Sequence, residues 1–208
     1  MQNIFRRLHA SQRGITGLET AIILIAFVVV ASVFAYTVLS AGIFSSEKGK
    51  EAVHSGLKQA RGSMEMVGGV IAKDTDSDGY VDKLIVTVSN ALDGEPIDLT
   101  TTTDSDGDGL LSDESSKSHV VVVTYVDKNQ RVEDIAWTRS QVGKGDGDEL
   151  LERGEKFELT IDLTNIETGS NPLGRDSTFM IEIKTPSGST LILERTTPSK
   201  IDAVMDLN

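Results

Sequence analysis

The sequence contains no cysteine, which excludes a disulfide framework and any thiolate chemistry. It also lacks an excess of positive charge, because 32 acidic residues outnumber 20 basic ones and give a formal charge of −12. Phosphate binding needs a basic patch and none is visible, so we expect no nucleic-acid partner. Stability must then come from a packed core, a bound metal, or neighbouring subunits of an assembly.

Signatures of catalysis are also missing. The sequence has no Walker loop, no G-x-S-x-G pattern and no H-E-x-x-H pattern. Its three histidines, His9, His54 and His119, stand far apart in the chain, and each is expected at the surface. No N-x-S/T sequon is present, which excludes sequon-based N-glycosylation. The sequence therefore predicts a protein that is not an enzyme.

Charge is nearly absent near the amino terminus. Between residues 16 and 46, Glu19 is the single acidic or basic residue, and residues 21–39 are apolar except for one serine, one tyrosine and one threonine. At about 1.5 Å per residue in a helix, this apolar stretch extends roughly 28 Å, which matches the hydrocarbon core of a bilayer. The sequence therefore predicts a segment that can span a membrane.

A basic segment precedes the apolar stretch. Residues 1–14 carry three arginines and no acidic residue, which favours an orientation with this segment in the cytoplasm. A secretory signal peptide would have a shorter apolar region followed by its cleavage site, but here the small residue, Gly14, comes first. We therefore expect a cut between Gly14 and Ile15 that removes residues 1–14 and keeps the hydrophobic helix.

Glu19 is the exception in the apolar segment and would be the fifth residue of the cleaved chain. A fully inserted carboxylate near the end of a membrane helix costs about 2–3 kcal/mol. The free N–H groups of the helix N-terminus, or an α-amino group at Ile15 in the same or a neighbouring subunit, would offset this cost. The alternative is that Glu19 lies at the level of the lipid headgroups.

The helix is predicted to continue past the apolar stretch, from Gly17 to about Arg61, because apolar and charged residues alternate there at helical spacing. Gly62, or the pair Gly68-Gly69, is expected to end it. Such a helix is roughly 68 Å long and cannot be covered by the rest of the chain. Its apolar surface is therefore expected to pack against identical neighbours, and its small residues would allow close approach. The alternative is a single-pass anchor of a monomer.

We expect three parts: residues 1–14 as a cleaved leader, 15–62 as the hydrophobic helix, and 63–208 as a β domain. Hydrophobic alternation is clearest in residues 84–88, 157–163 and 179–183. The predicted fold class is α+β, with a long N-terminal hydrophobic α-helix followed by an antiparallel Ig-like β-sandwich or barrel of about eight strands. The expected strands are Met66–Ala72, Leu84–Asn90, His119–Val126, Val132–Trp137, Phe157–Leu163, Phe179–Lys184, Thr190–Leu193 and Ile201–Leu207.

Two loops of the β domain carry aspartates at alternate positions. The first contains Asp74, Asp76, Asp78, Gly79 and Asp82, and the second contains Asp104, Asp106, Asp108, Gly109 and Asp113. Oxygen ligands at positions 1, 3 and 5 with Gly at position 6 are typical of a Ca²⁺ loop, although neither loop has the acidic residue of an EF-hand at position 12. We expect structural Ca²⁺ in both; the alternative is a solvated acidic turn. A third cluster, at residues 145–152, is expected to be a plain turn.

The amino-terminal pattern resembles a known family. Arg13-Gly14 followed by ITGLETAIILIAFVVVASVFAYTVLSAGIF resembles the class III signal peptide of type IV pilin-like proteins. Gly17-Leu18-Glu19 and the continuation through residue 44 are more similar to archaellins, the subunits of the archaeal swimming filament, than to adhesive pilins. The resemblance covers roughly residues 6–62. It implies that Arg13, Gly14 and Ile15 form the processing site of a membrane prepilin-type peptidase, and that Gly17 and Glu19 serve assembly.

The resemblance implies a structural, extracellular subunit whose precursor waits in the cytoplasmic membrane. After cleavage, a membrane-embedded ATP-driven machine would move it into a filament of identical or paralogous subunits. The helices would form the core and the β domains an acidic outer shell. Two alternatives stay open: an archaeal adhesion pilin, and a membrane-anchored Ca²⁺-binding surface module. Retention of residues 1–14 would indicate the anchored module, and normal swimming after deletion would indicate the adhesion pilin.

Overall fold

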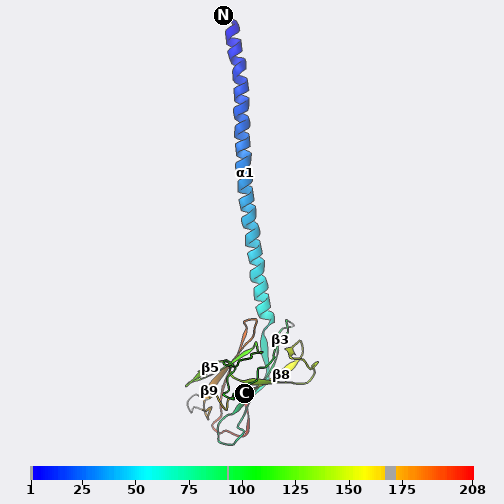
Figure 1. Ribbon diagram of the computed structural model, residues 1–208, viewed down its shortest axis with the longest axis vertical. Helices are drawn as coiled ribbons and strands as arrows, with labels where there is room; N and C mark the ends of the chain where they lie inside the picture. Colours follow the sequence, from blue (N-terminus) through cyan, green and yellow to red (C-terminus); the bar gives the residue numbers. More distant parts are fainter. Residues whose placement is uncertain (1, 93, 167–171) are drawn as a thin grey trace. The chain divides into compact units, whose positions relative to one another are not determined.

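The computed structural model describes residues 2–92, 94–166 and 172–208, with side chains from Gly17 onward. One helix, α1 (Gln2–Arg61), is followed in these ranges by eleven strands (Figure 1). The strands are β1 (Met64–Lys73), β2 (Lys83–Asn90), β3 (Ile97–Asp98), β4 (Val122–Asp127), β5 (Arg131–Val132), β6 (Trp137–Gln141), β7 (Leu150–Leu151), β8 (Lys156–Asp162), β9 (Thr178–Lys184), β10 (Thr190–Thr196) and β11 (Val204–Leu207).

Helix α1 begins at Gln2, earlier than the predicted start at Gly17, and ends at Arg61 as expected. Residues 2–16 contain no proline, and a single glycine costs a helix only about 1 kcal/mol, so nothing in this segment breaks the helix. The chain with its leader is therefore helical across the expected cleavage point. The side chains of Arg13, Gly14 and Ile15 lie outside the described residues.

The strands form antiparallel sheets. A five-stranded sheet has the order β11-β1-β2-β8-β6, a four-stranded sheet has the order β10-β9-β4-β5, and the short strands β3 and β7 pair with each other. The fold class is thus the expected one, a long apolar helix followed by antiparallel β-structure.

One hydrophobic core lies between the two larger sheets. Alternate residues of β8 and β9 point into it, so Phe157 and Leu159 from one sheet and Phe179 and Ile181 from the other are almost fully buried. Burying each such side chain contributes about 1.5–3 kcal/mol. The period of two in the sequence is therefore the direct cause of a two-layered sandwich.

The predicted strand Val132–Trp137 is wrong. Val132 ends β5 in the four-stranded sheet, whereas Trp137 begins β6 in the five-stranded sheet. Between them the chain crosses from one sheet to the other: Asp134 adopts a left-handed backbone with φ of 59°, and Ile135 forms an isolated bridge with Leu110. Both Ile135 and Trp137 are buried, so their hydrophobicity fills the core without forming one strand.

His119 is not at the surface as expected. Its side chain is 4% exposed and lies between Thr102 and Asp134, with Nδ1 2.7 Å from Thr102 Oγ1 and Nε2 2.9 Å from Asp134 Oδ1. The predicted strand from His119 to Val126 accordingly begins later, at Val122, because residues 118–119 bond to the Thr102 side chain instead of to a strand.

The chain divides into two compact units, Met1–His54 and Ser55–Asn208. The division falls within the helix, before the boundary expected at residue 62, because the last helical turns contact the β domain. Gln59 Nε2 donates a hydrogen bond to Gly188 O at 3.4 Å, and the backbone of Gly94 passes against the carbonyl group of Arg61. Residues 55–61 therefore belong structurally to the β domain.

Candidate functional sites in the helix and the aspartate loops

The described part of α1 presents apolar side chains to solvent on all sides. Phe27 is 71% exposed, Phe34 is 67% exposed and Leu39 is 64% exposed. The segment Gly17–Arg61 is the single helix in the described ranges that is long and apolar enough to cross a membrane, judged by length and composition alone. A helix that is hydrophobic all round needs lipid or other helices around it, because water penalises every face of it.

The serine and the threonine in the apolar stretch bond to their own helix. Ser32 Oγ donates to Val28 O at 2.7 Å, and Thr37 Oγ1 donates to Phe34 O at 2.9 Å. These groups need no water, which suits a segment that is buried in lipid or in a helix bundle.

Gly17 and Glu19, the expected assembly residues, both lie on the exposed apolar helix. A Cβ atom added at Gly17 would meet no atom of the described residues within 4 Å, and the same holds for three further helical glycines, Gly42, Gly49 and Gly56. Each costs the helix up to about 1 kcal/mol relative to alanine. No contact among the described residues therefore requires glycine at these four positions.

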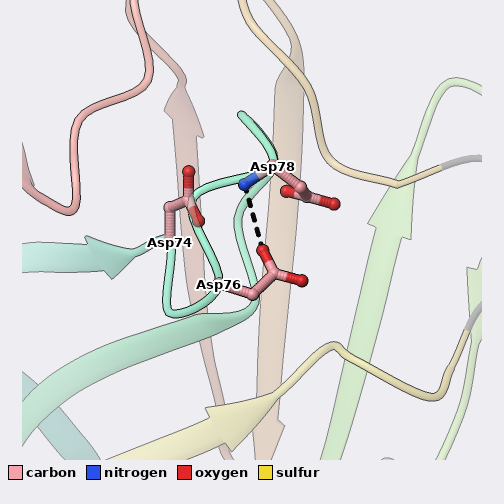
Figure 2. A group of neighbouring side chains, drawn as sticks. All are labelled: Asp74, Asp76 and Asp78. Carbon is pink, nitrogen blue, oxygen red and sulfur yellow. Dashed lines mark hydrogen bonds between the residues drawn. The ribbon is translucent and has the colours of Figure 1, made fainter.

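The first aspartate loop connects β1 to β2 and gathers three carboxylates. One oxygen from each of Asp74, Asp76 and Asp78 lies within 4.8 Å of the others, and Figure 2 shows the three side chains around one tight turn. Asp74 is buried and accepts hydrogen bonds from the N–H groups of Ser77 at 2.6 Å and Gly79 at 3.0 Å. The loop backbone thus folds around the first aspartate.

The carboxylates of Asp76 and Asp82 accept hydrogen bonds from other parts of the same loop. Asp76 Oδ1 accepts from the N–H of Asp78 at 3.1 Å, the bond drawn in Figure 2. Asp82, the fourth expected ligand, lies outside the three-residue group and is buried. Its carboxylate accepts from the N–H and the hydroxyl group of Thr75, so it closes the loop.

The second aspartate loop repeats this arrangement. Asp104, Asp106 and Asp108 bring one oxygen each within 4.8 Å of one another, and Asp104 accepts from the N–H groups of Gly107 at 2.7 Å and Gly109 at 2.9 Å. Two segments thirty residues apart in the sequence thus adopt the same hydrogen-bonded turn.

Asp113 lies outside the second group and is exposed. Its neighbour Glu114 reaches back into the loop, and its carboxylate accepts from the N–H and the hydroxyl group of Ser105. Glu114 thus does for this loop what Asp82 does for the first. The sequence signal for both is an acidic residue eight to ten positions after the first aspartate.

The third cluster has the same turn without the first carboxylate. Asp146 Oδ1 accepts from the N–H of Asp148 at 3.1 Å, but Lys144 occupies the position that matches Asp74 and Asp104. Buried Glu155 instead accepts from the N–H groups of Asp146 and Glu152, both at 3.2 Å. A single buried carboxylate therefore organises this loop.

The charges of the loops change the acidity of individual groups in opposite directions. The hydrogen bond from the Asp78 N–H lowers the pKa of Asp76, but desolvation and the neighbouring carboxylates of Asp78, Asp82 and Asp74 outweigh it and raise the pKa above its usual value. Hydrogen bonds from Ser105 lower the pKa of Glu114. Crowded carboxylates of this kind are the groups that a divalent cation would neutralise.

The chain is similar in sequence to proteins of one known family over most of its length. A model of the archaeal-type flagellin family matches residues 14–195. Probable flagellin 1 of Archaeoglobus fulgidus is 39% identical over 207 residues, which cover 97% of this chain and 98% of that protein. Probable flagellin 1 of Aeropyrum pernix is 31% identical over 201 residues, which cover 91% and 94%.

Solved structures agree with this assignment. The structure of the archaeal flagellum of Methanospirillum hungatei strain JF1 superposes with a TM-score of 0.60 at 26% identity and covers 92% of this chain and 98% of that one. The crystal structure of the archaeal flagellin FlaB1 from Methanocaldococcus jannaschii, at 12% identity, shares the fold with a TM-score of 0.53 and covers 69% and 95%. This chain therefore belongs to the archaeal-type flagellin family and is a structural subunit of the extracellular archaeal flagellum.

Proposed function

We propose that α1 is the polymerisation element and that leader removal between Gly14 and Ile15 releases it for assembly. One observation carries this proposal: a helix of 60 residues exposes large apolar side chains on every face of its described part. Helices of neighbouring subunits would cover that surface. Exchange of lipid contacts for helix contacts would let the chain move from membrane to filament without exposing the apolar stretch to water.

The amino-terminal residues supply the processing and assembly chemistry in this proposal. A prepilin-type peptidase cuts after Gly14, and the basic leader stays in the cytoplasm. The cut creates an α-amino group at Ile15, whose positive charge balances the carboxylate of Glu19 within a subunit or between neighbours. An ATP-driven membrane machine then moves the subunit into the filament. The chain itself has a structural and not a catalytic role.

A pair of valine substitutions tests the role of the helix. Val33 in α1 is 58% exposed and Val204 in β11 is 61% exposed, so the two side chains have nearly the same exposure in a single chain. Val33→Lys would place an unpaired charge in the filament core, which costs several kcal/mol. We expect Val33→Lys to abolish recovery of the chain in sheared, pelleted filaments, whereas Val204→Lys retains it. Equal recovery of both variants would contradict the proposal.

We also propose that the two three-aspartate loops hold structural Ca²⁺. The carboxylates at positions 1, 3 and 5 of each loop converge within 4.8 Å, and Gly79 and Gly109 occupy position 6 with positive φ. Calorimetric titration of chelator-treated protein with Ca²⁺ tests this. We expect heat of binding and a raised melting temperature, both reduced in Asp74→Asn and in Asp104→Asn. No heat and no change in melting temperature would leave plain acidic turns.

A further inference from the structure

The junction between α1 and β1 is two residues long and carries backbone carbonyl groups that a helix end leaves unpaired. Arg61 is the last helical residue and Met64 the first residue of β1. The N–H of Gly62 donates to Lys58 O at 3.1 Å, which is the last bond of the helix. Carbonyl groups beyond this point need partners from elsewhere.

Three hydroxyl groups surround the carbonyl oxygen of Gly62. Thr185 Oγ1 lies 3.1 Å from it, Ser187 Oγ lies 2.9 Å from it and Ser189 Oγ lies 3.0 Å from it. A carbonyl oxygen accepts about two hydrogen bonds. The third hydroxyl is satisfied within the group, because Thr185 Oγ1 is 2.8 Å from both Ser187 Oγ and Ser189 Oγ.

The three hydroxyls come from one rigid turn, the tip of the β9–β10 hairpin. The N–H of Thr185 donates to Ser189 O at 3.0 Å, and the N–H of Gly188 donates to Thr185 O at 3.0 Å. Thr185 is 6% exposed, so water does not compete easily for its hydrogen bonds. The turn is therefore preorganised to hold the carbonyl group.

Packing at the same point leaves no room for a side chain. A Cβ atom at Gly62 would lie 2.4 Å from Ser187 Oγ and 2.6 Å from Ser187 Cβ, with no strained φ to account for the glycine. A Cβ atom at Gly94 would lie 2.0 Å from the carbonyl oxygen of Arg61. The helix end is therefore held from two sides by close backbone approach.

The remaining contact between charges is too exposed to do this. Lys58 Nζ and Glu95 Oε1 are 3.9 Å apart, and both side chains are more than half exposed. Exposed pairs of this kind contribute little. The buried hydroxyl of Thr185, the half-buried hydroxyls of Ser187 and Ser189 and the two glycines are thus the groups that fix the end of the helix.

We propose that Gly62 and the hairpin hydroxyls of Thr185, Ser187 and Ser189 form a joint that locks the terminal turn of α1 to the β domain. Without it the domain could rotate about the backbone dihedral angles of residues 62 and 63. The joint removes that freedom, so that the terminal turn of α1 stays fixed to the β domain. This role rests on the function proposed above, because the joint bears load only when α1 lies in a filament.

Hydrogen–deuterium exchange of sheared filaments tests the joint. The variant Thr185→Val/Ser187→Ala/Ser189→Ala removes the three hydroxyls. We expect amide hydrogens of residues 58–64 to exchange at least about tenfold faster than in the unchanged chain, because the turn can open locally. Amide hydrogens of β4 and β8 should keep their rates.

A matched control lies at the other end of the same hairpin. Thr178 Oγ1 and Thr196 Oγ1 are 2.9 Å apart on β9 and β10 and do not contact Gly62. Thr178→Val/Thr196→Val should leave exchange at residues 58–64 unchanged. The proposal is overturned if this control accelerates exchange as much as the triple variant, or if the triple variant exchanges at the original rate.

A second pair of variants decides the question if the triple variant fails to fold. Gly62→Ala should accelerate exchange at residues 58–64. Ser187→Gly added to it should slow the exchange again, because it removes the atoms that the new Cβ meets while the hydroxyls of Thr185 and Ser189 still donate to the carbonyl oxygen. Absence of this rescue overturns the joint. Failure of the proposed function gives a different result, because the unchanged chain would then be missing from the filament pellet. In that case the same exchange comparison would be made on the full chain in detergent and would still test the joint.

Discussion

Thr102 shows how much a single buried hydroxyl can hold together. Its Oγ1 accepts hydrogen bonds from the N–H groups of Ser118 at 2.8 Å and His119 at 3.0 Å. With both lone pairs used, its own proton is directed to Nδ1 of His119, 2.7 Å away. In that arrangement Nδ1 accepts, so the single N–H proton of the neutral ring is on Nε2, which faces Asp134. One threonine thus sets the tautomer of a buried histidine and the path of the chain before β4.

We therefore expect Thr102→Val to destabilise the β domain by roughly 1–3 kcal/mol, because two partly buried hydrogen bonds from backbone N–H groups lose their acceptor. Thr103 is the matched control, since it is adjacent and exposed. Thr103→Val should change the stability by less than about 0.5 kcal/mol. Thermal unfolding of the full-length chain in detergent measures both, and equal melting temperatures for the two variants would contradict the assignment.

The carboxylates of the aspartate loops predict opposite pH effects in the metal-free protein. The pKa of Asp76 is raised in the fold, so deprotonation there works against folding, and stability falls as the pH rises through that raised value. The pKa of Glu114 is lowered, so its contribution is present above the unfolded pKa and is lost as the pH falls through the folded value.

With a chelator at pH 7, Asp76→Asn should therefore raise the melting temperature and Glu114→Gln should lower it. Both differences should shrink as the pH falls through the ordinary carboxyl range, the Glu114 difference at the lower pH because the pKa of this group is lowered in the fold. Melting curves across this range check the sign. A lower melting temperature for Asp76→Asn at pH 7 would show that the charge of Asp76 does not destabilise the metal-free protein.

At the scale of elements, the sequence was most informative where one physical signal acted alone. Helix α1 could be predicted because an uninterrupted apolar run has one compatible structure, and its end at Arg61 follows from Gly62. The central strands β2, β8 and β9 could be predicted because their alternation survives in the burial pattern.

Elements determined by tertiary contacts could not be predicted in this way. The crossing from β5 to β6 has the same hydrophobic residues as a strand, and only the bridge between Leu110 and Ile135 reveals the change of sheet. The two-residue strands β3 and β7 have no periodicity to detect. The aspartate loops can be recognised by their residue spacing. The roles of Asp82 and Glu114 depend on how the chain folds back, because only then do their carboxylates contact Thr75 and Ser105.

At the scale of the whole molecule, the chain combines an acidic β domain with a helix that carries no charged residue from 20 to 46. Loss of the leader, which carries three arginines and no acid, would change the formal charge from −12 to −12 − 3 = −15. Such domains repel one another, which favours solubility and opposes close packing. Burial of the helices must outweigh that repulsion in a filament, and cations at the aspartate loops would reduce it.

We expect cleavage after Gly14 to free a helix that polymerises. N-terminal sequencing of this protein, sheared from intact cells and pelleted as filaments, tests both parts at once. We expect Ile-Thr-Gly-Leu-Glu at the terminus of the pelleted material. A chain that still begins with Met1 and is found only in the membrane fraction would contradict it and would make the protein an anchored surface module.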